Sequence, residues 1–202
     1  MFRAQFGEDK FLSTWFPAGY IGTCVEVGAD DGLSGSNTAF FEDNGWECLC
    51  IEPIPKQFEK CKSVRKNVLN CCAGAEDRDD TIFHAYYLHD GTASAISSLE
   101  PDSRLISQLG HLISSIVDIP VRTRTLNTLF KEVNFPQKID FISIDTENTE
   151  LDVLKGLDLD FYDVTYFIIE NNYNEPQCID YLTNKGYKLI TRLGVNDIFK
   201  KQ

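Results

Sequence analysis

The chain has 202 residues, of which 43% are hydrophobic, and its formal net charge is -12. This length and apolar content suit a single folded domain over residues 1–202 and argue against disorder. The negative charge would repel nucleic-acid phosphates, and no run of lysine and arginine offsets it. We therefore expect no nucleic-acid partner, and a substrate that is neutral or whose anionic groups are screened by a metal.

The first half of the chain alternates apolar runs with amphipathic segments. A strand is predicted at Thr23–Val27, and a helix follows with Ser36 as its expected N-cap and Asn44-Gly45 as its stop signal. A second strand is predicted at 47–52, with a helix from about 55 to 66. This order of strand, helix, strand and helix predicts a parallel sheet.

The second half repeats the same order. Strands are predicted at 139–144 and 164–169, separated by a helix that ends before Gly156. A last helix runs from near Pro176 to Gly186. The segments 187–192 and 195–199 then flank a turn at Gly194, which predicts a closing antiparallel hairpin.

The region from about 86 to 124 shows less regularity. It carries Asp90-Gly91, a serine cluster (Ser94, Ser97 and Ser98) and Glu100-Pro101-Asp102. Clusters of small polar residues, glycine and proline are typical of loops. We interpret this region as a lid over the active site.

The sequence predicts no membrane-spanning segment. No stretch approaches the roughly 20 apolar residues that a span needs, and the start Met1-Phe2-Arg3-Ala4-Gln5 lacks the apolar block of a signal peptide. The seven cysteines are odd in number and several lie in apolar runs, so we expect reduced, buried thiols and no structural zinc. We expect a cytoplasmic protein, in the host cytoplasm if it is viral; its oligomeric state is left open.

The first strand leads into a turn suited to a cofactor. It ends in Glu26-Val27-Gly28-Ala29-Asp30-Asp31-Gly32, which places glycines where the backbone approaches a ligand closely. Asp30 and Leu33 stand where a dinucleotide fingerprint has glycines, which argues against NAD. Asp30 can instead accept hydrogen bonds from an amine, and Glu52 follows the second strand where a carboxylate binds ribose hydroxyls. S-adenosylmethionine carries both groups and no phosphate, so it is the predicted cofactor.

The sequence resembles the FkbM family of methyltransferases over nearly its whole length. The matching motifs are QFGED at 5–9, VEVGADDG at 25–32 with SNT at 36–38, IEP at 51–53, DFISIDTE at 140–147 and NDIF at 196–199. The resemblance implies an α/β fold with a Rossmann-like seven-stranded class I methyltransferase sheet and helices on both faces. It also implies O-methylation of sugars, polyketide hydroxyls or related carbon frameworks. The expected donor-binding residues are Gln5, Glu26, Gly28, Asp30, Ser36, Asn37 and Glu52.

One position departs from the family pattern. The family usually has glycine after its Asp-x-Glu motif, whereas this chain has Asn148. Asparagine tolerates a left-handed backbone better than most residues, so we expect the loop to be retained. The added side chain is expected to affect the choice of acceptor more than activity.

Further candidate ligands lie at two more strand ends. Asp145 ends the fourth core strand, and Glu170-Asn171 ends the fifth, its expected neighbour. Carboxylate and amide oxygens suit Mg²⁺ or Mn²⁺, so Asp145, Glu170 and Asn171 are predicted metal ligands. Such a metal would hold two neighbouring substrate oxygens and lower the pKa of the reacting hydroxyl.

Glu147, two residues beyond Asp145, is the predicted catalytic base, and Asp145 is assigned to the same catalytic site. A structural interpretation of Glu147 is almost as well supported: a first-turn acid stabilising a helix that begins near Thr149. His111, in the predicted lid, is a less favoured alternative base.

The sequence therefore predicts an S-adenosylmethionine-dependent O-methyltransferase that is metal-assisted and acts on a sugar hydroxyl. The preferred acceptor is a 6-deoxyhexose such as rhamnose in a glycan, through a resemblance to glycan-modifying proteins of large DNA viruses. Two alternatives stay open: methylation of a small phenolic or polyketide hydroxyl, and a non-catalytic nucleotide-binding module.

Overall fold

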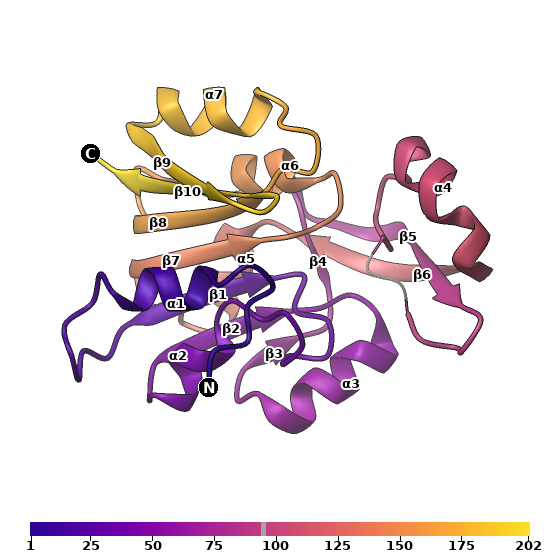
Figure 1. Cartoon of the computed structure of the whole chain (residues 1–202), viewed down its shortest axis with the longest axis horizontal. Helices are drawn as coiled ribbons and strands as arrows, with labels where there is room; N and C mark the ends of the chain where they lie inside the picture. The colour runs from indigo at the N-terminus through magenta and orange to yellow at the C-terminus, as the bar shows by residue number, and fades with distance from the viewer. Residues whose placement is uncertain (94–95) are drawn as a thin grey trace.

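A seven-stranded sheet forms the centre of the molecule, in the order β3-β2-β1-β7-β8-β10-β9 (Figure 1). The computed structural model describes residues 1–93 and 96–202, so Ser94 of the predicted serine cluster lies outside the described residues. The strands are β1 (Thr23–Val27), β2 (Glu47–Ile51), β3 (Val68–Leu69), β7 (Lys138–Ile144), β8 (Asp163–Glu170), β9 (Tyr187–Leu193) and β10 (Asn196–Lys201). In this sheet β10 pairs antiparallel with both β8 and β9, and the other strand pairs are parallel. The predicted α/β fold, the seven-stranded sheet and the closing hairpin are confirmed.

The central strands are apolar because both of their faces are buried. In β1, Val25 and Val27 join one core cluster, while Cys24 joins a second cluster across the sheet. The same alternation continues in β7, where Ile142 and Phe141 belong to opposite clusters. Of the seven cysteines, all free thiols, six are buried.

Helices cover both faces of the sheet, as predicted. They are α1 (Glu8–Ser13), α2 (Ala39–Asp43), α3 (Pro55–Val64), α5 (Leu126–Glu132), α6 (Glu150–Lys155) and α7 (Gln177–Asn184). Leu12 of α1 and Phe41 of α2 pack on one face, and Leu129, Leu154 and Leu182 of α5, α6 and α7 pack on the other. No helix in residues 1–93 or 96–202 is long and apolar enough to cross a membrane.

The start of α2 differs slightly from the prediction. Thr38, not Ser36, occupies the N-cap position. The Ser36 hydroxyl nevertheless accepts a hydrogen bond from the backbone N–H of Ala39, at 3.0 Å. Ser36 therefore stabilises the start of α2 from a position two residues before the N-cap. Its hydroxyl also donates a hydrogen bond to Glu26.

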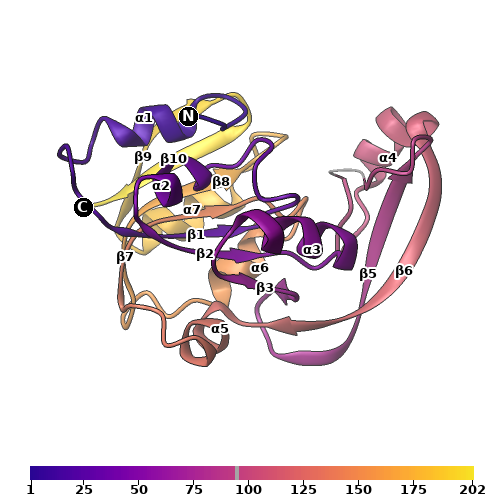
Figure 2. The same ribbon diagram turned by 90° about the horizontal axis from the view of Figure 1, so that it is seen from below.

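A second, three-stranded sheet projects from the central one (Figure 2). It consists of β4 (Cys72–Ala73), β5 (Arg78–Leu88) and β6 (Ile113–Arg124), and between β5 and β6 lie α4 (Ser103–Leu109) and the 3-10 helix η1 (Gly110–Leu112). We call residues 78–88 together with 103–124 the arm. The prediction of irregular structure is wrong here, because β6 is largely exposed and so lacks the alternating hydrophobic pattern that identifies a strand.

Candidate active site

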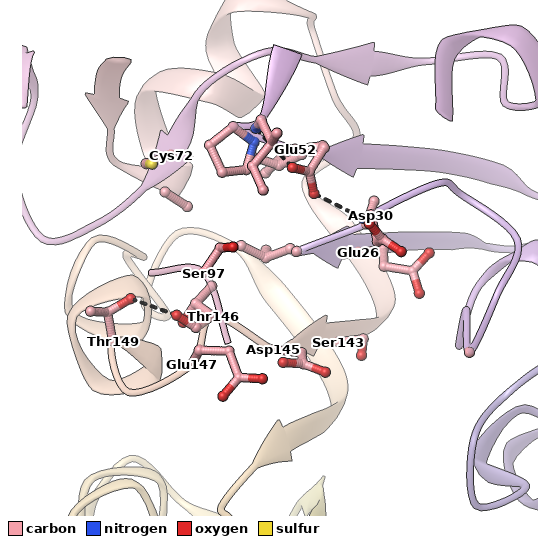
Figure 3. Close-up of a pocket in the computed structure, with 18 of the residues that line it drawn as sticks. Glu26, Asp30, Glu52, Cys72, Ser97, Ser143, Asp145, Thr146, Glu147 and Thr149 are labelled. Carbon is pink, nitrogen blue, oxygen red and sulfur yellow. Dashed lines mark hydrogen bonds between the residues drawn. The ribbon is translucent and has the colours of Figure 1, made fainter. Parts of the chain in front are cut away.

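A cavity of about 220 Å³ lies at the carboxyl ends of β1, β2 and β7 (Figure 3). We call it the donor cavity. All seven residues predicted to bind the donor line it, together with the two predicted catalytic residues: Gln5, Glu26, Gly28, Asp30, Ser36, Asn37, Glu52, Asp145 and Glu147. Residues far apart in sequence thus meet at the edge of the sheet where parallel α/β proteins bind ligands.

Gly28 allows β1 and β7 to approach each other at the floor of the cavity. Its φ of 85° lies in the left-handed region, where glycine is favoured. A Cβ at this position would collide with the backbone carbonyl oxygen of Asp145. The glycine is therefore required both by the turn and by the packing of the neighbouring strand end.

Glu52 is held at one side of the donor cavity, beside Asp30 (Figure 3). Its two carboxylate oxygens accept hydrogen bonds from the backbone N–H groups of Asp30 and Ile54, each at 2.8 Å. Burial raises the pKa of Glu52 to about 8. The Asp30 carboxylate accepts a hydrogen bond from the side-chain amide of Gln57, so it lies on the Glu52 side of the cavity.

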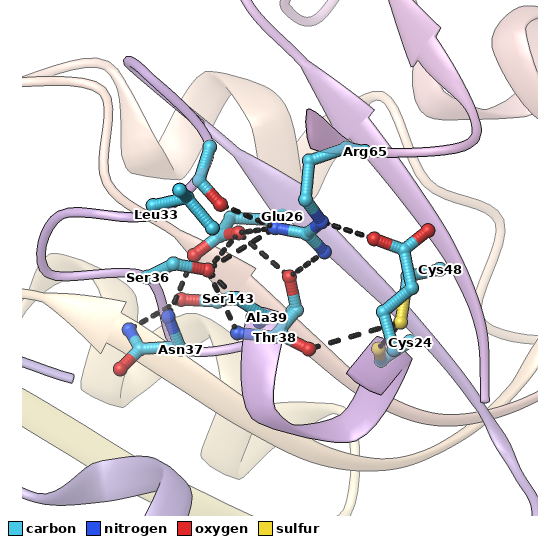
Figure 4. A network of polar contacts seen from close by, with 12 residues as sticks. Cys24, Glu26, Leu33, Ser36, Asn37, Thr38, Ala39, Cys48, Arg65 and Ser143 are labelled. Carbon is cyan, nitrogen blue, oxygen red and sulfur yellow. Dashed lines mark hydrogen bonds and ion pairs between the residues drawn. The ribbon is translucent and has the colours of Figure 1, made fainter. Parts of the chain in front are cut away.

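Glu26 organises the loop that follows β1 (Figure 4). Its carboxylate accepts hydrogen bonds from the Ser36 hydroxyl at 2.7 Å, the Asn37 backbone N–H at 2.7 Å and the Thr38 hydroxyl at 2.6 Å. These bonds bring residues 36–38 against the cavity. Glu26 is thus already occupied by protein donors, and it presents its neighbours to the cavity.

Arg65 completes this network, although nothing in the sequence pattern marked it. Its guanidinium, buried at the end of α3, contacts Glu26 at 3.2 Å and also pairs with Glu42. Burial lowers the pKa of Arg65, but the carboxylates of Glu26 and Glu42 more than offset this and hold it above its usual range. The loop around the donor cavity therefore depends on a buried ion cluster.

Asn37 presents an unused acceptor to the donor cavity. Its side-chain N–H₂ donates to the Ser143 hydroxyl at 2.9 Å. Its Oδ1 atom is buried and has no hydrogen-bond partner among residues 1–93 and 96–202. A buried carbonyl oxygen without a partner costs free energy, so a ligand donor at this position would be stabilising.

Gln5 reaches the cavity because both ends of the chain fix its loop. Asp9 accepts a hydrogen bond from the backbone N–H of Arg3 at 2.6 Å. The buried Glu8 carboxylate accepts one from the side-chain amide of Asn196, in β10, at 2.6 Å. The sequence motifs at 5–9 and 196–199 are thus in direct contact.

Three carboxylates converge on the β7 and β8 side of the cavity. Oxygen atoms of Asp145, Glu147 and Glu170 lie within 4.8 Å of one another. The Oε2 atom of Glu147 is buried and has no hydrogen-bond partner in the part of the chain that the structure describes. We call these three residues the carboxylate cluster.

Protein atoms around the carboxylate cluster exclude much of its hydration, and its charges repel one another. Loss of hydration raises the pKa of Asp145 to about 7, even though this side chain opens onto the cavity. Burial and the Asp145 charge together raise the pKa of Glu147 to about 8 and that of Glu170 well above its ordinary value. Bringing a positive charge to the cluster would relieve this repulsion.

Asn171 does not join the carboxylate cluster. Its side-chain N–H₂ donates to Asp197 at 2.8 Å and to the Glu175 backbone carbonyl, while its Oδ1 accepts from the Glu175 backbone N–H. The structure therefore brings Asp145 and Glu170 together with Glu147, and it directs the Asn171 amide into the loop before α7.

Glu147 lies in a turn that a neighbouring acid supports. Glu147 and Asn148 have φ values of 55° and 96°, so Asn148 adopts the glycine-like conformation expected at this position. Glu150 is the first of two acids in the first turn of α6, and its Oε1 accepts from the backbone N–H groups of Thr146 and Asn148. Glu150 therefore supports this turn, and the Glu147 carboxylate faces the cavity.

The arm and the segment that follows β5 contribute side chains to the donor cavity. Phe83 of β5 lines the cavity, and so do Ser97 and Leu99 from the segment between β5 and α4. His111 lies in η1 and is exposed, and it is not among the described residues that line the cavity.

Comparisons with known proteins give one family match and several similar folds. Residues 26–189 match the family model of the methyltransferase FkbM domain. The fold is similar to that of a methyltransferase FkbM from Methylobacillus flagellatus KT, with 15% identity and a TM-score of 0.55 over 98% of this chain and 48% of that protein. A TehB-like SAM-dependent methyltransferase from Corynebacterium glutamicum ATCC 13032 gives 9% identity and a TM-score of 0.48 over 98% of this chain and 89% of that protein.

A search of curated proteins gives no match. The chain spans less than half the length of the Methylobacillus protein. The family model, in contrast, covers most of the chain and includes the end of β1, the Glu52 strand end and the Asp145 loop. The chain belongs to the methyltransferase FkbM domain family.

Proposed function

We propose that residues 1–202 act as one S-adenosylmethionine-dependent O-methyltransferase domain that methylates a sugar hydroxyl. The preferred acceptor is a 6-deoxyhexose such as rhamnose in a glycan. The observation that carries the proposal is the carboxylate cluster, which lies beside a cavity of the right chemistry for the methyl donor. A carboxylate at that point can accept the proton that a hydroxyl loses on methylation.

The donor cavity offers a partner for each part of S-adenosylmethionine. Glu52 would accept hydrogen bonds from the ribose hydroxyls. The unpartnered Oδ1 of Asn37 would accept one from the methionine amine. Ile54, Phe83 and Leu99 supply apolar surface for the adenine ring. This assignment leaves the sulfonium methyl facing the carboxylate cluster.

In the proposed reaction the acceptor oxygen forms a bond to the methyl carbon while the bond between that carbon and sulfur breaks. The sulfonium becomes the thioether of S-adenosylhomocysteine, and the hydroxyl proton passes to the Glu147 carboxylate. Glu147 suits this role because one of its oxygens is buried without a protein partner. The Glu150 hydrogen bonds to the turn fix its backbone.

The carboxylate cluster also fits a divalent cation. Its three carboxylates offer hard oxygen ligands within 4.8 Å of one another, and one oxygen is buried without a partner. We propose that Asp145, Glu147 and Glu170 hold Mg²⁺ or Mn²⁺. When bound, the ion would lower the pKa of the acceptor hydroxyl. Glu147 could then serve as ligand and base through different oxygen atoms.

The first test is calorimetric titration of the protein with S-adenosylhomocysteine, with NADH as a parallel control. We expect micromolar binding of S-adenosylhomocysteine and no binding of NADH. An acceptor screen with S-adenosylmethionine, read by mass spectrometry, should then show methyl addition to a glycoside with Mg²⁺ and a large loss of product with EDTA. Binding of NADH alone would contradict the proposed function, and methylation only of phenols would replace the sugar acceptor.

The raised pKa of Glu52 predicts a pH dependence of donor binding. With a pKa of about 8, Glu52 is mostly protonated at neutral pH, and ribose hydroxyls bind its ionised form better. The affinity for S-adenosylhomocysteine should therefore rise, by up to about tenfold, as the pH increases from about 6.5 to about 8.5. Calorimetry across this range measures the effect. In Glu52→Gln the affinity should be lower and this rise should disappear; an unchanged rise would assign it to another group.

A further inference from the structure

A second cavity, of about 240 Å³, lies between the N-terminal ends of α6 and α7. Its lining is rich in side chains that form hydrogen bonds, including Asn148, Glu170, Asn171, Asn172 and Glu175. Polar walls of this kind suit a ligand with many hydroxyl groups.

The two cavities meet at the carboxylate cluster. Asp145 and Glu147 line the donor cavity, and Glu170 lines the second one. The carboxylate oxygens of these residues lie within 4.8 Å of one another, and Thr149 lines both cavities. A molecule in the second cavity would therefore reach the cluster at Glu170, whereas the donor cavity reaches it at Asp145 and Glu147.

The charge of the second cavity selects against anions. The described residues that line it include no lysine, arginine or histidine. The nearby Lys155 pairs with Asp152, and Arg104 pairs with Glu175 and Asp102. These two cations already pair with acids, and no ion pair of the described residues involves Glu150 or Glu170, which also line the cavity. Bringing a carboxylate or phosphate beside Glu150 and Glu170 would cost free energy through repulsion and lost hydration.

The arm contacts two residues that line the second cavity. The Arg104 guanidinium of α4 lies 3.6 Å from the centre of the Tyr173 ring, and its Nη1 atom lies 2.6 Å from Glu175. Tyr173 and Glu175 both line the second cavity. The arm therefore holds the loop before α7 in place beside the ligand.

We propose that the second cavity binds the methyl acceptor as a neutral, polyhydroxylated glycoside and presents one of its hydroxyls to the carboxylate cluster. This inference rests on the proposed function. It further specifies that the acceptor binds in the second cavity and carries no charge. Asn172 is exposed and would donate and accept hydrogen bonds with ligand hydroxyls. Asn148 extends the same polar wall at the position where the family usually has glycine.

The test measures glycoside affinity by NMR titration in the presence of S-adenosylhomocysteine and Mg²⁺. The probes are methyl glycosides of a neutral 6-deoxyhexose and of glucose, and methyl glucuronide as the anionic counterpart. Asn172→Ala should weaken binding of the neutral probes by about 3- to 10-fold, the value of one lost hydrogen bond. Asn148→Gly is a second variant that the backbone accepts, because φ is 96° there.

Asn174→Gly is the matched control. Asn174 is exposed on the same loop, is not among the described residues that line the second cavity, and has a φ of 55° that glycine accepts. The Asn174→Gly protein should bind the neutral probes like the wild type. This control and the two cavity variants should all bind S-adenosylhomocysteine with wild-type affinity. Equal binding of the glucuronide, unchanged binding in both cavity variants, or no binding of any neutral probe would overturn the inference while leaving donor binding intact. Failure of the wild type to bind S-adenosylhomocysteine would instead overturn the proposed function itself.

Discussion

Replacing Glu147 by glutamine should lower kcat for methyl transfer by a factor of roughly 10²–10⁴, the usual contribution of a positioned general base. Glutamine has nearly the same shape but cannot accept the hydroxyl proton. The backbone turn should persist, since its hydrogen bonds come from Glu150 and not from the Glu147 side chain. The measurement is steady-state turnover with the glycoside that the wild-type protein methylates.

Two further measurements make this result specific. Calorimetry should show that the Glu147→Gln protein still binds S-adenosylhomocysteine, because Glu52 and Asn37 hold the donor in the proposed arrangement. Glu59→Gln, an exposed glutamate on α3, should turn over like the wild type. Wild-type turnover in Glu147→Gln would remove Glu147 from the mechanism.

Replacing Arg65 by methionine should reduce the free energy of unfolding by about 3–5 kcal/mol, as expected when one partner of a buried ion pair is removed. Arg65 is the cation that Glu26 and Glu42 share, and its side chain is only 1% exposed. Without it, two buried carboxylates face each other with no compensating charge. Urea denaturation followed by circular dichroism measures the loss.

Lys201→Ala provides the matched control, because it also removes one partner of an ion pair. Lys201 and Asp163 are 2.8 Å apart, but their side chains are 41% and 58% exposed. An exposed pair of this kind contributes less than about 1 kcal/mol. If Arg65→Met cost no more than Lys201→Ala, the ion cluster would not stabilise the loop around the donor cavity.

The central sheet could be predicted from the sequence because its strands are buried on both faces. Runs such as 139–144 and 164–169 are short, apolar and rich in β-branched residues, and the structure places β7 and β8 there. The arm could not be predicted in this way. Most of β6 is exposed, and its pairing with β5 joins residues that are distant in sequence, such as Phe83 and Ile119.

Some residues of the candidate site could likewise be predicted from the sequence, and others could not. Glycines and acids directly after strands marked Gly28, Glu52 and Asp145, because parallel strands bring their carboxyl ends to one edge. The role of Arg65 depends on the position of the end of α3 beside Glu26 and Glu42 in the folded protein. No local sequence motif indicates this position. The Asn171 amide bonds to Asp197 from β10, a partner that only the folded hairpin supplies.

The hydrogen bond between Glu8 and Asn196 has a consequence for protein synthesis. A chain leaves the ribosome from its N-terminus, so the buried carboxylate of Glu8 has no Asn196 partner until β10 has emerged. Sheet strands β1 and β2 can pair well before that moment. The loop that carries Gln5 is therefore fixed among the last parts of the donor cavity, and a nascent chain should acquire the ability to bind the methyl donor only when translation has passed the hairpin.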